Sequence, residues 1–90
     1  MKYLIVEHSF DPPLKEEDLN NISERLGPCL EQHKIKAMRS YVSDDGSRML
    51  CVFEAPDAES VRIAHRTANV DFDSVWVGEA FIKNLEEITE

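Results

Sequence analysis

Four side chains that can bind a cation or move a proton stand near predicted strand ends and in one predicted helix. Glu7 and His8 close an apolar opening segment, Glu54 closes a later one, and His65 lies in the helical segment that follows. Carboxylates supply hard oxygen ligands or an acid/base pair, and imidazoles supply nitrogen ligands or proton relays near neutral pH. Glu7, His8, Glu54 and His65 are therefore our candidate metal ligands, with a divalent cation as the cofactor.

Each carboxylate also has a structural role open to it. We expect Glu7 and Glu54 at the carboxyl ends of parallel, neighbouring strands, where two carboxylates would raise each other's proton affinity. Arg39 is a diagonal cross-strand neighbour of Glu54 and can form an ion pair with it instead. Both functions of the carboxylates, chemical and structural, stay open on the sequence alone.

The histidines have equally plain alternatives. Adjacent strand residues point to opposite faces, so His8 does not share a side with Glu7, which favours a surface or edge position. His65 lies about 12 Å along its helix at ~1.5 Å per residue. That helix is expected to run back from the end where His8 lies, so the two imidazoles are not expected to meet within one chain. His65 is therefore expected to be a packed residue whose ring nitrogens are hydrogen-bonded locally. His33 is expected to be exposed to solvent.

A second candidate site consists of aromatic side chains and one cation. Tyr3, Arg39, Tyr41 and Trp76 can line a pocket for a planar or carboxylated small molecule. The same aromatic residues can instead be the anchors of a protein interface. Cys51 is expected in the core, where its thiolate is disfavoured, and no Ser-His-Asp order, phosphate loop or metalloprotease spacing marks an enzyme.

Composition narrows the classes of partner. Eighteen acidic and ten basic residues give a formal net charge of −8, which argues against nucleic acid because its phosphates would be repelled. Cys29 and Cys51 lack the spacing of a disulfide framework or zinc knuckle. The opening apolar run is too short for a signal peptide, and no membrane span follows. We expect one soluble, cytoplasmic domain, residues 1–90, with a core over about 2–82 and a short acidic tail.

Periodicity predicts six elements that position these residues. Apolar alternation indicates strands, a 3- and 4-residue apolar spacing indicates helices, and the Asp45-Gly46 step indicates a tight hairpin that places Tyr41 opposite Leu50. Asp57 is the expected amino cap of the second helix. The elements are a strand over 2–8, a helix over 15–27, strands over 36–43 and 48–55, a helix over 57–69 and a strand over 73–82. After the first helix, Pro28 can open a further turn that carries Cys29 and Leu30 toward the core.

This order predicts an α+β, ferredoxin-like βαββαβ sandwich. Right-handed crossovers place both helices on one face of a four-stranded antiparallel or mixed sheet and leave the other face without cover. An apolar patch of that size is rare on a soluble monomer, so we expect a homodimer packed sheet against sheet. The expected patch contains Tyr3, Ile5, Tyr41, Leu50, Val52 and Trp76.

Part of the chain resembles a known family. Cys51, the step Glu54-Ala55-Pro56-Asp57 and His65 resemble a group of small bacterial proteins around a nickel-binding member, themselves similar to dimeric α/β-barrel proteins. The resemblance spans about residues 2–80. It implies the ferredoxin-like fold, a homodimer and metal binding, with nickel as the metal.

Three functions are compatible with these observations. The first is a small soluble dimeric protein that binds a divalent metal or a small ligand. The second is a cofactor-free enzyme of the dimeric α/β-barrel type, an isomerase or a monooxygenase, that works on a small molecule. A plain interaction module is the third, and the sequence does not identify a substrate.

Overall fold

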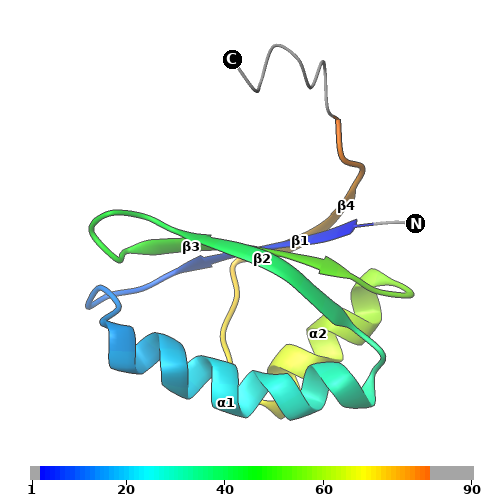
Figure 1. Ribbon diagram of the computed structural model, residues 1–90, viewed down its shortest axis with the longest axis horizontal. Helices are drawn as coiled ribbons and strands as arrows, with labels where there is room; N and C mark the ends of the chain where they lie inside the picture. Colours follow the sequence, from blue (N-terminus) through cyan, green and yellow to red (C-terminus); the bar gives the residue numbers. More distant parts are fainter. Residues whose placement is uncertain (1–2, 82–90) are drawn as a thin grey trace.

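The computed structural model describes residues 3–81 and contains six elements. Two helices lie under one face of a sheet, and the opposite face of the sheet has no helix over it (Figure 1). The predicted α+β, ferredoxin-like βαββαβ fold is confirmed. The elements are β1 (Tyr3–Ser9), α1 (Glu16–Gln32), β2 (Lys36–Val42), β3 (Arg48–Glu54), α2 (Ala58–Thr67) and β4 (Ser74–Gly78).

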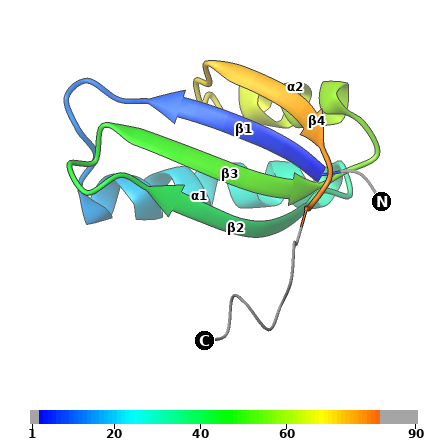
Figure 2. The ribbon, with the colours of Figure 1, turned by 90° about the horizontal axis from the view of Figure 1, so that it is seen from above.

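The sheet has the strand order β2-β3-β1-β4, which Figure 2 shows from its open side. All three strand pairs are antiparallel, so the expectation of parallel neighbours is wrong for β1 and β3. The reason is topological: the α1 crossover makes β1 parallel to β2, and the hairpin then reverses β3, which takes the place between them. Tyr3 consequently lies opposite Glu54, and Glu7 lies opposite Leu50.

The β2–β3 hairpin has the predicted register. Tyr41 lies opposite Leu50. Asp45 organises the turn because its Oδ1 accepts hydrogen bonds from the hydroxyls of Ser43 and Ser47, at 2.8 and 2.7 Å, and from the Ser47 amide. An aspartate or asparagine side chain that accepts a hydrogen bond from the backbone two residues further on is typical of such turns.

Helix α1 is longer than expected. The amide of Lys15 donates to Asp18 Oδ2 at 2.8 Å at the amino end, but the helix runs past the predicted stop at Gly27 and through Pro28 to Gln32. The residue before a proline resists helical geometry largely through its Cβ, which Gly27 lacks. The extra turn also buries Leu30 in the core. In the part of the chain that the structure describes, no helix is long and apolar enough to cross a membrane.

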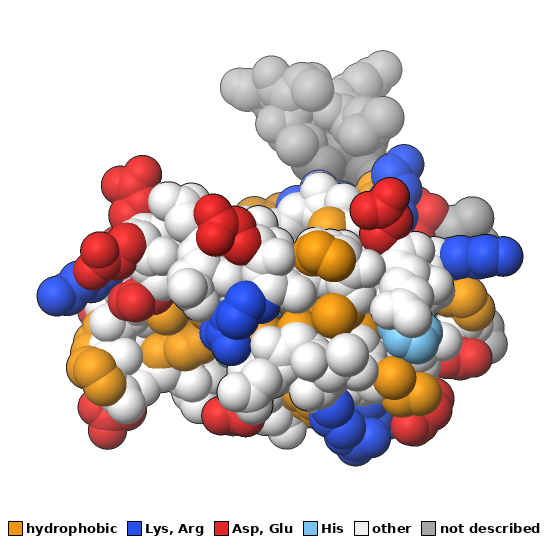
Figure 3. All heavy atoms as spheres, turned by 90° about the horizontal axis from the view of Figure 1, so that it is seen from below, with side chains coloured by type: hydrophobic (Ala, Val, Ile, Leu, Met, Phe, Trp, Pro, Cys, Tyr) orange, Lys and Arg blue, Asp and Glu red, His pale blue; other side chains and the backbone are white. Residues whose placement is uncertain are grey.

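The core lies between the sheet and the helices. Alternate residues of β1 and β3 point down to it, as the period of a half-buried strand requires. Figure 3 views the molecule from the helix side, where hydrophobic side chains gather along the middle and charged side chains surround them. The buried hydrophobic residues are Leu4, Val6, Leu26, Leu30, Ile35, Met49, Cys51, Phe53, Val61, Ala64, Ala68 and Val70.

Candidate functional site

The four predicted metal ligands separate into distinct places. Glu7 and Glu54 both lie on the open side, but at opposite ends of the antiparallel β1–β3 pair. They therefore do not form the expected carboxylate pair. His8 and His65, which were expected to stay apart, meet between sheet and helices.

The meeting of the histidines follows from strand direction. Because β3 is antiparallel to β1, α2 begins under the amino end of β1 and runs toward its carboxyl end (Figure 1). Eight residues of helix then carry His65 toward His8 rather than away from it. The expectation that they would not meet assumed that β3 was parallel to β1.

The histidine pair is enclosed by aromatic rings. The ring centroids of His8 and His65 are 5.5 Å apart with planes inclined by 31°, and the residues are 2% and 0% exposed. Phe10 stacks on His8 with centroids 5.9 Å apart. Phe53 and Phe72 meet the His65 ring edge-on at 5.8 and 5.5 Å. The prediction of a surface or edge position for His8 is therefore wrong.

The ring nitrogens of the pair are mostly without partners. His65 Nδ1 lies 2.8 Å from the carbonyl oxygen of Val61. A carbonyl can only accept, so Nδ1 carries the proton and Nε2 has the free lone pair. Among the side chains of residues 3–81, the buried polar atoms without a hydrogen-bond partner are His65 Nε2 and both ring nitrogens of His8. The prediction that the ring nitrogens of His65 are hydrogen-bonded locally therefore holds for Nδ1 only.

The environment keeps both rings neutral. Burial, reinforced by the neighbouring His65, lowers the pKa of His8 to about 4, against the opposing effects of the Met49 backbone and of the charge of Asp73. Burial also lowers the pKa of His65, against the opposing effect of its bond to Val61. Neutral imidazole is the form that ligates metals, so both rings are in the ligating state at neutral pH.

On the open face, Glu7 is the centre of a polar cluster. Its Oε2 accepts hydrogen bonds from Ser74 Oγ at 3.1 Å and from Trp76 Nε1 at 3.0 Å. Arg48 Nη2 lies 3.6 Å from Oε1. The ion pair between Arg39 and Glu54, which the sequence left open as an alternative, does not occur among the ion pairs of residues 3–81.

The predicted aromatic set converges. Tyr3, Arg39, Tyr41 and Trp76 line one hollow of about 240 Å³ on the open face, together with Ile5, Val52 and residues 78–80. The alternation of strand residues places them on the same side. Tyr41 is 59% and Trp76 47% exposed. Such a hollow can hold a flat organic molecule by its face and a carboxylate at the guanidinium, and its aromatic rims are also what a protein interface uses.

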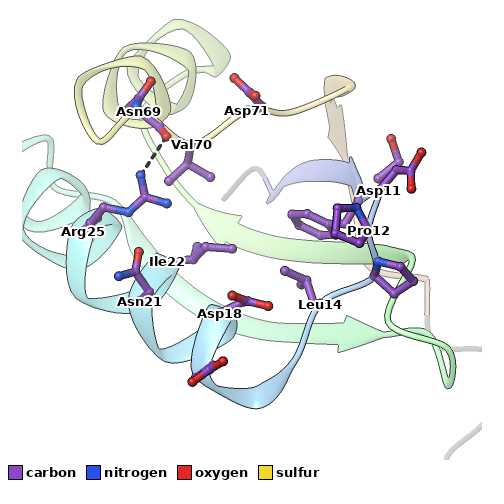
Figure 4. A pocket seen from close by; sticks show the side chains of 14 residues that line it. Asp11, Pro12, Leu14, Asp18, Asn21, Ile22, Arg25, Asn69, Val70 and Asp71 are labelled. Atoms are coloured by element: carbon purple, nitrogen blue, oxygen red, sulfur yellow. Dashed lines mark hydrogen bonds between the residues drawn. The ribbon is translucent and has the colours of Figure 1, made fainter.

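A larger cleft was not predicted. It has a volume of about 700 Å³ and lies between the β1–α1 loop, the first half of α1 and the α2–β4 loop (Figure 4). Arg25 spans it and donates to the carbonyls of Ala68 and Asn69 at 3.3 and 2.9 Å. The other charged lining residues are acidic, so the cleft suits a neutral or cationic ligand: Asp11, Glu17, Asp18 and Asp71. No sequence periodicity connects these loops.

Comparison with known proteins agrees with the resemblance drawn from the sequence. The model of a family described as nickel responsive protein SCO4226-like matches residues 3–77. Among solved structures, the crystal structure of SCO4226 from Streptomyces coelicolor A3(2) is similar, with a TM-score of 0.73 and 15% sequence identity. The similarity covers 82% of this chain and 91% of that one, and at this identity it shows the fold. No curated protein matches.

Proposed function

The chain belongs to the nickel responsive, SCO4226-like family, and from this membership we propose that it is a cytoplasmic homodimer that binds a divalent metal ion, with Ni²⁺ as the metal. The family description supports the metal. The open face of the sheet supports the dimer, and it is the observation on which the proposed assembly rests.

The open face carries more apolar surface than its strands need for packing within one chain. Ile5, Leu50 and Val52 are only partly buried, and Tyr41 and Trp76 are about half exposed. Contiguous apolar surface of this kind marks interaction sites. A second copy presents the same face, so a two-fold axis that runs parallel to the sheets, between the two facing copies, covers both patches at once.

Light scattering coupled to size-exclusion chromatography tests the assembly. At micromolar concentration the wild-type chain, 10.3 kDa, is expected to elute with twice its mass. Val52→Glu places a charge at the centre of the open face and is expected to give a monomer. Ile63→Glu is the matched control, because Ile63 is 39% exposed on α2, away from that face. A wild-type monomer would rule out the proposed dimer.

Metal binding is tested on the chelator-treated wild-type protein by isothermal titration with Ni²⁺. We expect saturable binding with a whole-number ratio of metal to chain. Mg²⁺ serves as the control cation, since it prefers an all-oxygen octahedral set rather than imidazole. Absence of heat and of retained nickel after dialysis would contradict the metal-binding function.

The hollow on the open face favours a second candidate function. Its lining is mostly apolar and aromatic, with Arg39 and Glu79 as its charged residues. Arg39 can pair with a carboxylate, so a small aromatic carboxylate is the ligand class that we propose, as a bound ligand or as the substrate of an enzyme of the dimeric α/β-barrel type. Titration with benzoate, followed by Trp76 fluorescence, is expected to show saturation that benzamide does not. Equal responses to both compounds would remove this candidate.

A further inference from the structure

We propose that His8 and His65 of one protomer form a metal site inside the fold, with His65 Nε2 and one ring nitrogen of His8 as its protein ligands. The metal class is a borderline divalent ion such as Ni²⁺, Co²⁺ or Zn²⁺, which imidazole suits. The proposal rests on the proposed function, which is metal binding, and adds the location of the metal and its protein ligands.

The first argument is the lack of partners. Buried polar atoms are nearly always hydrogen-bonded, and exceptions call for a physical explanation such as a bound ion. All such exceptions among the side chains of residues 3–81 are nitrogens of this one pair. Their concentration at a single point argues for a ligand shared by both rings rather than for two separate packing defects.

The second argument is the orientation of His65. Metal-bound histidine typically donates its other ring N–H to a carbonyl or carboxylate, which fixes the tautomer. The 2.8 Å contact from Nδ1 to the Val61 carbonyl does this here. It leaves the Nε2 lone pair bare and holds the ring on the rigid frame of α2.

The third argument is the spacing of the rings. A metal about 2.0 Å from one nitrogen of each ring lies about 3.2 Å from each ring centre, so the centres are about 5 to 6.5 Å apart for tetrahedral to linear angles. The observed separation is 5.5 Å. The separation of the ring centres is therefore within the range that one shared ion requires.

The fourth argument concerns charge and access. The negative charge of Asp73 acts on His8, and Asp71 lines a hollow of about 310 Å³ together with His65, Phe72 and the cationic Arg66. These carboxylates offset the charge of a cation that two neutral rings cannot offset. Within residues 3–81, no three side chains of His, Cys, Asp or Glu converge on one point, so the remaining coordination positions fall to water.

A purely structural role makes a different prediction. If the rings only filled the core, apolar side chains of similar volume would stabilise the fold equally well. Replacing the histidines would then leave the metal affinity unchanged. His65→Leu and His8→Leu distinguish these roles, because leucine keeps the volume and removes the nitrogens. His33→Gln is the matched control, since His33 lies at the carboxyl end of α1, outside the pair.

The experiment combines two readouts. Titration with Ni²⁺ is expected to show at least a tenfold loss of affinity in each leucine variant and none in His33→Gln. In the wild-type protein, Zn²⁺ is added during long-range ¹H–¹⁵N spectroscopy of the imidazoles. The ring nitrogens of His8 and His65 are expected to shift, and those of His33 to stay. This second readout needs no variant to fold.

The outcomes separate the two proposals. Unchanged Ni²⁺ affinity in both leucine variants, with unmoved His8 and His65 signals under Zn²⁺, would overturn the site while leaving a metal-binding protein. Wild-type protein that ignores Ni²⁺ but shows the Zn²⁺ shifts would overturn the nickel function and support the site. A leucine variant that does not fold leaves the decision to the wild-type spectra.

Discussion

The carboxylate of Glu7 accepts a hydrogen bond from the indole N–H of Trp76, at 3.0 Å, across the open face of the sheet. Ser74, which lies directly opposite Glu7 in the β1–β4 register, donates to the same oxygen at 3.1 Å. β4 is an edge strand of five residues. One side chain of β1 therefore holds two residues in the first half of this short strand in place.

Glu7→Ala is expected to loosen β4. Loss of two hydrogen bonds to a charged acceptor, partly open to solvent, should lower the free energy of unfolding by about 1 to 2 kcal/mol. Urea denaturation measures this, and amide exchange should rise selectively over residues 74–78. Glu54→Ala is the matched control on the same face and should change stability by less than about 0.5 kcal/mol. Equal losses in both variants would contradict the special role of Glu7.

Asp57 gives a prediction that depends on pH. Its carboxylate accepts the Ser60 amide at 2.7 Å at the amino end of α2, and this bond lowers the pKa of Asp57 below its ordinary value of 3.8. The stabilisation is therefore complete above the unfolded-state value and is lost as the pH falls through the lower, folded-state value.

Thermal unfolding from about pH 5 to about pH 2 measures this loss. Asp57→Asn keeps a neutral cap and should show a smaller drop in Tm across this range than the wild type. Asp57→Ala should lower Tm by a few degrees already at pH 7. If wild type and Asp57→Asn lose Tm in parallel, the cap carboxylate has no part in the acid response.

Local patterns predicted which way the side chains point, but not which ends of the sheet they occupy. The Asp45-Gly46 turn set the hairpin register, and alternation correctly placed Tyr3, Arg39, Tyr41 and Trp76 on one side. Strand direction is a property of the whole topology. Treating β3 as parallel to β1 therefore brought Glu7 and Glu54 together by mistake and kept His8 from His65.

The position of His8 was another error. Alternation puts His8 on the same side as Leu4 and Val6, which points to the core. We predicted an edge position because His8 points away from the side of Glu7 and cannot share a site with it. The large cleft depends on two loops and the first half of α1, which only packing brings together, and loops carry no periodic signal that could connect Asp11 with Asp71.

Gly46 tests the turn that set the register. Its φ of +75° lies in the left-handed region, and a Cβ there would come within 2.6 Å of the Leu14 carbonyl oxygen. We expect Gly46→Ala to cost about 1 to 3 kcal/mol in chemical denaturation. Gly46→Asn should cost nearly as much, although asparagine tolerates this φ, because it brings the same Cβ. An asparagine variant as stable as the wild type would mean that Leu14 moves aside at no cost.

The reactivity of the Cys51 thiol measures how tightly α1 covers the sheet. The residue is 4% exposed, and burial raises the pKa of its thiol, although Ser40 Oγ donates to the sulfur at 3.1 Å and acts in the opposite direction. Cys29 is a free thiol of intermediate exposure. At pH 8, iodoacetamide should therefore modify Cys51 at least about ten times more slowly than Cys29, since only an exposed thiolate reacts readily.

Peptide mass spectrometry follows both sites in one sample, and Cys29→Ser isolates the slow reaction. In concentrated urea the two cysteines should react alike, because unfolding removes the burial that separates them. Rapid native modification of Cys51, at a rate independent of denaturant, would mean that α1 leaves the floor of the core open to solvent. The proposed metal site between β1 and α2 also depends on the enclosure of the neighbouring core. In that case this enclosure would need a separate measurement.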